Sequence, residues 1–258
     1  TDWKLIRNMA GSDFYGRETG GKLSILDLSD ARIVKGGSAY YSDYEIVQCT
    51  SNDKLGDYAF YGCSRLTNLI LPSSVTEIGG AAFRGCSGLT NLTIPSSITS
   101  IAESTFRDCS GLTSLVIPSS VTSIGDAAFY GCNGLTSIYA YPENLPKLGT
   151  EVFTGCDAKN CILYVPTGTY DDYLVSEFGY FENIVDGINK DGLLTTQVTI
   201  KLDEAGTLPD RIGENQKNLI TNLKIVGKIN GTDLKFIREM AGRDFNREKT
   251  DGKLSILD

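Results

Sequence analysis

A repeat of 23 residues constrains this chain more than any other feature. Phenylalanines and cysteines both recur at that step, with one extra residue in the last step. The repeated positions are Phe60, Phe83, Phe106, Phe129 and Phe153, and Cys63, Cys86, Cys109, Cys132 and Cys156. Such self-similarity is typical of a solenoid, in which each repeat buries its apolar face only against its neighbours.

Each repeat divides into three blocks. The first is a strand with the pattern L-x-x-L-x-[IL], and a proline closes it because proline cannot extend a sheet ladder. The second is a short extended piece, and the third is an A-F-x-x-C turn whose phenylalanine fills the core. The pattern predicts a leucine-rich repeat solenoid, a right-handed α/β or mainly-β horseshoe-like array. The aliphatic residues predicted to point inward are Leu66, Leu69, Leu71, Val75, Ile78, Leu89, Leu92, Ile94, Ile98, Ile101, Leu112, Leu115, Ile117, Val121 and Ile124.

The period fails on both sides of the repeats, so we expect four segments. Residues 1–54 predict an irregular helix–strand rung with a tyrosine-rich connector, and residues 55–166 form the regular array. Residues 167–190 predict a cap, and residues 191–258 a second helix-containing module. In the first segment, Trp3, Leu5, Ile6 and Met9 predict the apolar face of a short helix. The residues predicted to point inward after that helix are Leu23, Leu26, Leu28, Ile33 and Val34.

The C-terminal segments predict further short elements. A strand at residues 162–165 precedes an expected short helix at residues 170–177, whose neighbouring aromatics can cover the core. Alternating apolar residues predict strands at 198–202 and 220–225, with a turn or short helix at 208–213 between them. Asn230 or Thr232 can cap a helix at residues 233–241.

The two ends of the chain carry the same 27-residue sequence in two versions. Residues 232–258 match residues 1–27 at 18 of 27 positions. Each end interrupts a structural unit, because the first copy lacks the strand that precedes the helix in the second, and the second copy stops inside its strand. A segment of a longer array is one explanation, because solenoids extend by tandem copying. Head-to-tail association between chains through open strand edges is the other.

Composition narrows the classes of function. The chain has no histidine, which excludes Ser-His-Asp and Cys-His catalytic systems and the usual zinc sites. The net charge of −8 and the absence of a basic run argue against nucleic-acid binding. No phosphate-binding loop or dinucleotide-binding motif is present. We therefore expect a chain with no enzymatic activity, no cofactor, no metal and no membrane span.

The repeated cysteines fit a role as small buried apolar residues better than a disulfide framework. Residues on adjacent rungs lie about 4.8 Å apart, too far for the Cβ separation of about 3.8 Å that a disulfide prefers. Cys156 and Cys161 are the pair best placed to cross-link, although we expect them to remain thiols.

The joint pattern L-x-x-L-x-[IL]-P-x-x-[VI]-x-x-I-x-x-x-A-F-x-x-C resembles the BspA-like leucine-rich repeats of bacterial surface proteins. The flanking segments IRNMAG, IREMAG, KLSILDLSDARIV and LYVPTGTYDDY also look like those attached to such arrays in Bacteroides-type anaerobes. The resemblance implies a curved solenoid, secretion or display on the cell surface, and adhesion to host proteins, matrix or other bacteria.

Side chains that point away from the core are the candidates for ligand binding. With Leu69 and Leu71 inward, alternation along the strand places Asn68 and Ile70 on the outer face. The same rule predicts two columns that continue to tyrosines. The predicted binding residues are Asn68, Ile70, Asn91, Thr93, Ser114, Val116, Ser137, Tyr139 and Tyr141. An inert, solvated sheet is the alternative, because serine and threonine also simply suit β-structure.

The tyrosine-rich connector is a second candidate. Tyr40, Tyr41 and Tyr44 could stack on a sugar or a peptide, or they could cover the junction between the first rung and the array. The sequence therefore leaves three functions open. A module that binds host or bacterial proteins through the exposed strands is the leading hypothesis, and a carbohydrate-binding module and a structural spacer are the alternatives.

Overall fold

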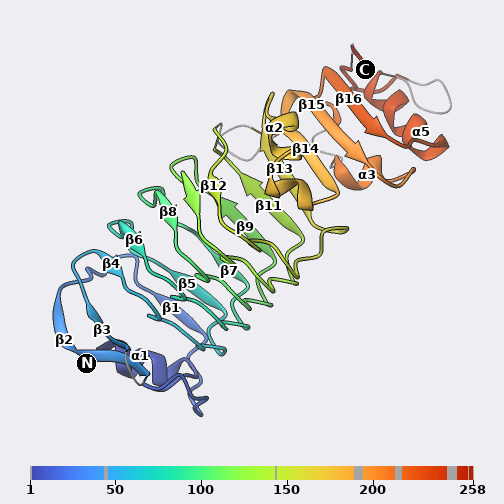
Figure 1. Cartoon of the computed structure of the whole chain (residues 1–258). Helices are drawn as coiled ribbons and strands as arrows, with labels where there is room; N and C mark the ends of the chain where they lie inside the picture. The colour runs from blue at the N-terminus through green and yellow to red at the C-terminus, as the bar shows by residue number, and fades with distance from the viewer. Residues whose placement is uncertain are drawn as a thin grey trace. The chain divides into compact units, whose positions relative to one another are not determined.

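The computed structural model describes residues 2–43, 46–142, 144–188, 194–212, 217–242, 249–254 and 256–257. The chain forms two compact units (Figure 1). The first unit comprises residues 1–136 and 144–157, and the second comprises residues 137–143 and 158–258. The predicted Tyr44 lies outside the described residues.

The first unit is a β-solenoid whose rungs repeat every 23 residues, as predicted. Residues one period apart pair in parallel, so Asn68 lies opposite Asn91 and Leu69 opposite Leu92. Three parallel sheets run along the array, in the orders β1-β5-β7, β8-β10-β12 and β4-β6, and β9 lies beside β7 (Figure 1). The elements are α1 (Asp2–Met9), β1 (Ile25–Asp27), β2 (Gly36–Asp43), β3 (Ile46–Thr50), β4 (Lys54–Leu55), β5 (Asn68–Ile70), β6 (Glu77–Ile78), β7 (Asn91–Leu92), β8 (Ser100–Ile101), β9 (Ser114–Ile117), β10 (Ser123–Ile124) and β12 (Lys147–Leu148).

A ladder of phenylalanines fills the core of the array. Successive rings from Phe60 to Phe153 stack with centroids 5.2–5.7 Å apart and interplanar angles of 2–6°. The ring spacing follows from the period, because the separation of neighbouring strands, about 4.8 Å, brings each ring onto its copy. The aliphatic residues from Leu66 to Ile124 that were predicted to point inward are all buried.

The repeated cysteines form a second ladder beside the phenylalanines. The thiol of Cys86 donates a hydrogen bond to the Phe60 carbonyl at 3.0 Å, and Cys109 and Cys132 repeat the contact at 3.1 Å one and two rungs later. Burial raises the pKa of the Cys63 thiol to about 12. All seven cysteines, including Cys156 and Cys161, are thiols in this structure, and those of the repeat serve as core residues, as predicted.

The N-terminal rung differs from the prediction in two respects. Val34 is 60% exposed rather than inward, whereas Ile33 is buried. Helix α1 packs on the array through Trp3, whose ring meets Phe60 edge-on at 5.0 Å. Only part of its predicted apolar face is engaged, because Leu5 and Met9 are 61% and 44% exposed. The periodicity located the helix correctly but did not identify the face that packs on the array.

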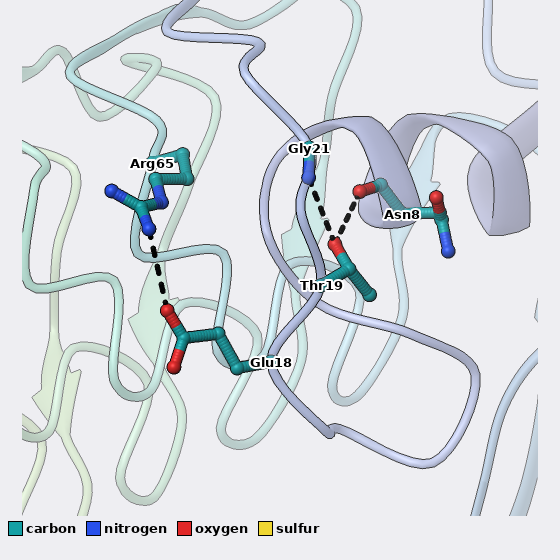
Figure 2. Close-up of polar contacts among 5 residues, drawn as sticks. All are labelled: Asn8, Glu18, Thr19, Gly21 and Arg65. Carbon is teal, nitrogen blue, oxygen red and sulfur yellow. Dashed lines mark hydrogen bonds and ion pairs between the residues drawn. The ribbon is translucent and has the colours of Figure 1, made fainter.

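The loop after α1 folds back against the last turn of the helix. Figure 2 shows Thr19 between Asn8 and Gly21, where its hydroxyl donates to the Asn8 carbonyl at 2.6 Å. Gly21 is required here, because a Cβ would lie 2.2 Å from the Asn8 carbonyl oxygen and 2.3 Å from that of Met9. An exposed ion pair between Arg65 and Glu18, at 3.4 Å, joins the loop to the first regular repeat (Figure 2).

The second unit is built on one sheet with the order β17-β16-β15-β14-β13-β11 (Figure 1). Pairing is parallel except between β14 and β15. The strand at 162–165, both short helices and the strands at 198–202 and 220–225 were predicted, although Gly213 lies outside the described residues. The elements are β11 (Ser137–Ala140), β13 (Ile162–Pro166), α2 (Tyr170–Leu174), the 3-10 helix η1 (Glu177–Tyr180), β14 (Asn183–Ile188), β15 (Leu194–Leu202), α3 (Leu208–Arg211), β16 (Asn222–Gly227), α5 (Gly231–Met240) and β17 (Ile256–Leu257).

Strand β14 is buried on both faces and marks a change in the side of the sheet that carries the core. Ile184 pairs with Leu163 on one face, and Val185 lies opposite Ile200 on the other. The chain direction reverses between β14 and β15, which are antiparallel. Because crossovers between parallel strands keep the same right-handed sense, those after β14 must lie on the opposite face of the sheet. The core on that face, the second core, consists of Val185, Ile188, Val198, Ile200, Leu202, Leu208, Ile212, Ile220, Leu223, Phe236, Ile237 and Met240.

Helix α5 begins with a capping box. The side chain of Asn230 accepts the backbone N–H of Thr232 at 2.8 Å, and the buried Asp233 carboxylate accepts the backbone N–H of Asn230 at 2.8 Å. Asp233 also accepts the backbone N–H of Leu208 at 2.9 Å, which ties α5 to α3. Of the two predicted caps, Asn230 is therefore the one used.

The duplicated segments adopt the same local structure in the two units. The Leu23 amide donates to the Met9 carbonyl at 2.8 Å, and Leu254 donates to the Met240 carbonyl at 2.8 Å. Gly252 repeats the close approach of Gly21, because a Cβ there would lie 2.2 Å from the Met240 carbonyl oxygen. The two copies are thus the same helix–loop–strand motif placed in two different surroundings.

Candidate binding face

A shallow groove of about 320 Å³ lies on the outer face of strands β5 and β7 in the first unit. Four of the predicted binding residues, Asn68, Ile70, Asn91 and Thr93, line it together. The inward neighbours Leu69 and Leu92 form its floor and belong to the core. The alternation that buries one face of each strand therefore brings these four outward side chains together.

The groove combines hydrogen-bonding and apolar groups. Asn68 and Asn91 are in register, so their two amides lie side by side and can each donate and accept hydrogen bonds. Ile70 is 43% exposed beside them. On β9, Ser114 and Val116 are half-buried and do not line the groove.

Three residues that line the groove were not predicted. Ser73, Pro95 and Ser96 come from the loops that follow β5 and β7. A P-S-S segment follows three successive strands of the array, at residues 72–74, 95–97 and 118–120. A loop that recurs at the same place in successive repeats must lie on the same side of each rung. That regularity could have identified these residues as lining the groove.

The predicted residues of the second unit lie in a different environment. Tyr139 and Tyr141 are half-buried and pack against the second core. The Tyr139 ring stacks on Tyr164 at 4.7 Å with an interplanar angle of 6°. Burial raises the pKa of the Tyr164 hydroxyl to about 12. Ser137 is half-buried on the same strand.

Tyr40 and Tyr41 are buried at the junction between α1 and the array. The Tyr40 hydroxyl donates to the Asp57 carbonyl at 3.0 Å, and burial raises the pKa of that hydroxyl. The Tyr41 ring stacks on Tyr58 at 4.5 Å with an interplanar angle of 7°. Both tyrosines therefore pack within the protein, and their ring faces are not open to solvent.

A second depression of about 390 Å³ lies at the N-terminal rung. Its lining includes Trp3, Ile6, Leu28 and Val34, with the basic side chains of Arg32 and Lys35 among the other lining residues. Within the described part of the chain, no group of three or more His, Cys, Asp or Glu side chains is placed to hold a metal ion. The helices that the structure describes are too short or too polar to cross a bilayer.

The comparison with protein families agrees with the repeat architecture. Residues 38–166, half of the chain, match the BspA type leucine rich repeat region in six copies. A leucine rich cell surface protein from Faecalibacterium prausnitzii A2-165 is similar at 18% sequence identity and a TM-score of 0.36, over 93% of this chain and 70% of that protein. No curated protein shows significant similarity to the chain.

Proposed function

Because the chain belongs to the BspA-type leucine-rich repeat family, we propose that it is a non-enzymatic surface module that binds an extended segment of another protein. The groove on β5 and β7 is the observation that carries this proposal. Solenoids offer extended surfaces of this kind to protein ligands. The proposed ligands are proteins of a host matrix or of another bacterial surface, and the proposed setting is adhesion after secretion or display at the cell surface.

The chemistry of the groove suits a peptide. Side-chain amides such as those of Asn68 and Asn91 can pair with the N–H and C=O groups of an extended main chain. Ile70, exposed beside them, offers an apolar contact to one of the side chains of such a segment that point toward the groove. Threonine and serine at the edges add short hydroxyl groups that leave room for the ligand backbone.

Carbohydrate binding is less well supported. Protein sites for sugars use exposed aromatic rings as stacking surfaces, but no aromatic residue lines the groove. Tyr40 and Tyr41, the residues expected to offer such rings, are buried. The spacer hypothesis predicts that the groove binds nothing, so the same experiment tests it.

The test is a binding screen of the full chain against immobilised extracellular-matrix proteins, with a glycan array run in parallel. Two variants block the groove, Ile70→Arg and Thr93→Trp, and each should lower binding to a protein ligand by tenfold or more. Ser100→Arg is the matched control, because Ser100 is exposed on strand β8 outside the groove. Binding that the Ser100 variant loses and the groove variants retain would place the site elsewhere. Binding to glycans alone would favour the carbohydrate hypothesis.

A further inference from the structure

The two copies of the duplicated segment bury different faces of the same helix. In α5, Phe236 is 5% exposed and Met240 is fully buried in the second core. Their counterparts in α1 are Leu5 and Met9, which are 61% and 44% exposed. The face that α5 packs on the strands of its own unit is therefore open in α1.

The opposite face of the helix shows the reverse pattern. In α1, Arg7 and Ala10 are fully buried against the array, and Arg7 donates to the carbonyls of Tyr58 and Ala59. The counterparts in α5, Arg238 and Ala241, are exposed. The duplicated motif thus has two contact faces, one for a leucine-rich repeat array and one for a β–α–β module.

We propose that the open face of α1 and the edge of β1 dock on the β15–α3–β16 module of a second copy of this chain, in the place that α5 and β17 occupy. The second unit identifies this occupant, because it shows what covers the same face of the same motif. Leu5, Ile6 and Met9 would enter the second core of the partner chain as Phe236, Ile237 and Met240 do in their own. This proposal is independent of the groove on β5 and β7.

Strand pairing gives the docking a defined register. In the second unit, Asn222 pairs with Ile256 and Leu223 with Leu257, in parallel. The counterparts of Ile256 and Leu257 are Ile25 and Leu26 of β1, which is an edge strand in the first unit. Edge strands readily accept a further strand. The exposed Ile25, at 63%, adds to the apolar surface that docking would cover.

Competition from α5 sets the strength of the association. A tethered segment such as α5–β17 has an effective concentration of the order of 1 mM at its own module. A second chain at about 10 µM competes at a disadvantage of about 100-fold, so the wild-type chain should associate only weakly. Displacing α5 removes that competitor, so the fraction of modules occupied by a second chain at 10 µM should rise from about 1% by as much as 100-fold.

The experiment mixes two full-length chains, of which one provides only the docking module and the other only the α1 face. The first chain carries Phe236→Asp and Met240→Asp to release α5, and Leu5→Asp and Met9→Asp to prevent it from docking itself. The second is the wild-type chain, which offers only its α1 face. Light scattering after size-exclusion chromatography of a mixture at 10 µM should show a complex of one chain each. Adding Leu5→Asp and Met9→Asp to the second chain should abolish the complex, whereas Asn8→Asp, an exposed change on the same helix, should preserve it.

If the release of α5 also loosens the module, amide hydrogen exchange provides a second measurement of docking. The wild-type chain should then restore amide protection to residues 198–202 and 222–225 of the first chain. It should also gain protection at its own residues 25–27. A mixture in which neither chain gains protection and no complex forms would overturn the proposal. A complex that survives Leu5→Asp and Met9→Asp in the wild-type partner would overturn it equally.

Discussion

Different kinds of contact stabilise the cores of the regular array and of the C-terminal module, the part of the second unit formed by β15, α3, β16 and α5. In the array each buried group contacts its own copy one period away, as Phe83 does with Phe60 and Phe106. Thr90 and Thr113 repeat the same principle, because each donates its hydroxyl to the carbonyl of the threonine one rung earlier. In the module, each buried contact joins two different residues and occurs only once. Asp233, for example, accepts hydrogen bonds from the backbone amides of Asn230 and Leu208.

This difference determines how a defect should spread. A repeat contacts only its neighbours, so the loss of one array residue weakens the two interfaces on either side of it. A buried group of the module instead joins several elements at once, and its loss should loosen the whole module while the array stays intact.

Phe106→Ala should have the largest effect. The ring lies in the middle of the ladder and is 1% exposed, and its removal should cost about 4 kcal/mol of unfolding free energy. Urea unfolding followed by far-UV circular dichroism measures the loss. Thiol labelling locates it, because Cys109 and Cys132 should react faster while the exposed Cys49 reacts at an unchanged rate. Equal acceleration at every buried thiol would show that the array unfolds as one block.

Asp233→Ala should cost about 3 kcal/mol, confined to the second unit. The carboxylate is fully buried and accepts backbone N–H groups from Gly206, Leu208 and Asn230, which would be left without this partner. Hydrogen exchange should show faster exchange in α5 and β16 and no change in the array. Asp251→Ala, an exposed change, is the control. Equal loss of protection in the array would contradict the separation of the two units.

The same contrast explains how much the sequence could reveal. A period predicts every contact in which a residue meets its copy, so the strands, the inward residues and the two columns whose members line the groove were predictable. Leu5 and Met9 were predicted as the apolar face of the helix that contains them. Their exposure could not be predicted, because the helix contacts the array through Trp3, Arg7 and Ala10, and no period specifies those contacts.

The candidate binding face shows the same limit. Asn68, Ile70, Asn91 and Thr93 were predicted from alternation alone and line one groove. Tyr139 obeys the same alternation, but it packs on a second core that exists only because chain direction reverses after β14. No local pattern around Tyr139 encodes that reversal.

Cys109→Ser should cost about 1 kcal/mol. The hydroxyl can donate to the Phe83 carbonyl as the thiol does, so the hydrogen bond is preserved. The loss comes from replacing a weakly polar sulfur by a more strongly hydrated group in a fully buried position. Chemical denaturation of this variant beside Cys109→Ala separates the two contributions. A cost above about 3 kcal/mol for serine would indicate that the hydroxyl does not reach the carbonyl.

Asp108→Gly should have the smallest effect and the opposite sign. Glycine occupies the same turn position in other repeats, with φ of 71°, 74° and 71° at residues 62, 85 and 131, whereas Asp108 adopts φ of 60° with a side chain. Glycine adopts this left-handed conformation without strain, which should raise the free energy of unfolding by about 1 kcal/mol. The greater conformational freedom of glycine in the unfolded chain cancels part of that gain. The substitution also removes the exposed ion pairs of Asp108 with Arg84 and Arg107, and each of these contributes little to stability at moderate salt.

The expected gain is about 0.5 kcal/mol, measured by thermal unfolding in high salt. In low salt the ion pairs are less screened, so the gain should shrink. A gain that grows as salt is lowered would mean that Asp108 suffers net repulsion rather than attraction at this turn. Because the change sits in one rung, it also tests the array itself: stabilising one repeat should slow labelling of the neighbouring buried thiols before it affects distant rungs.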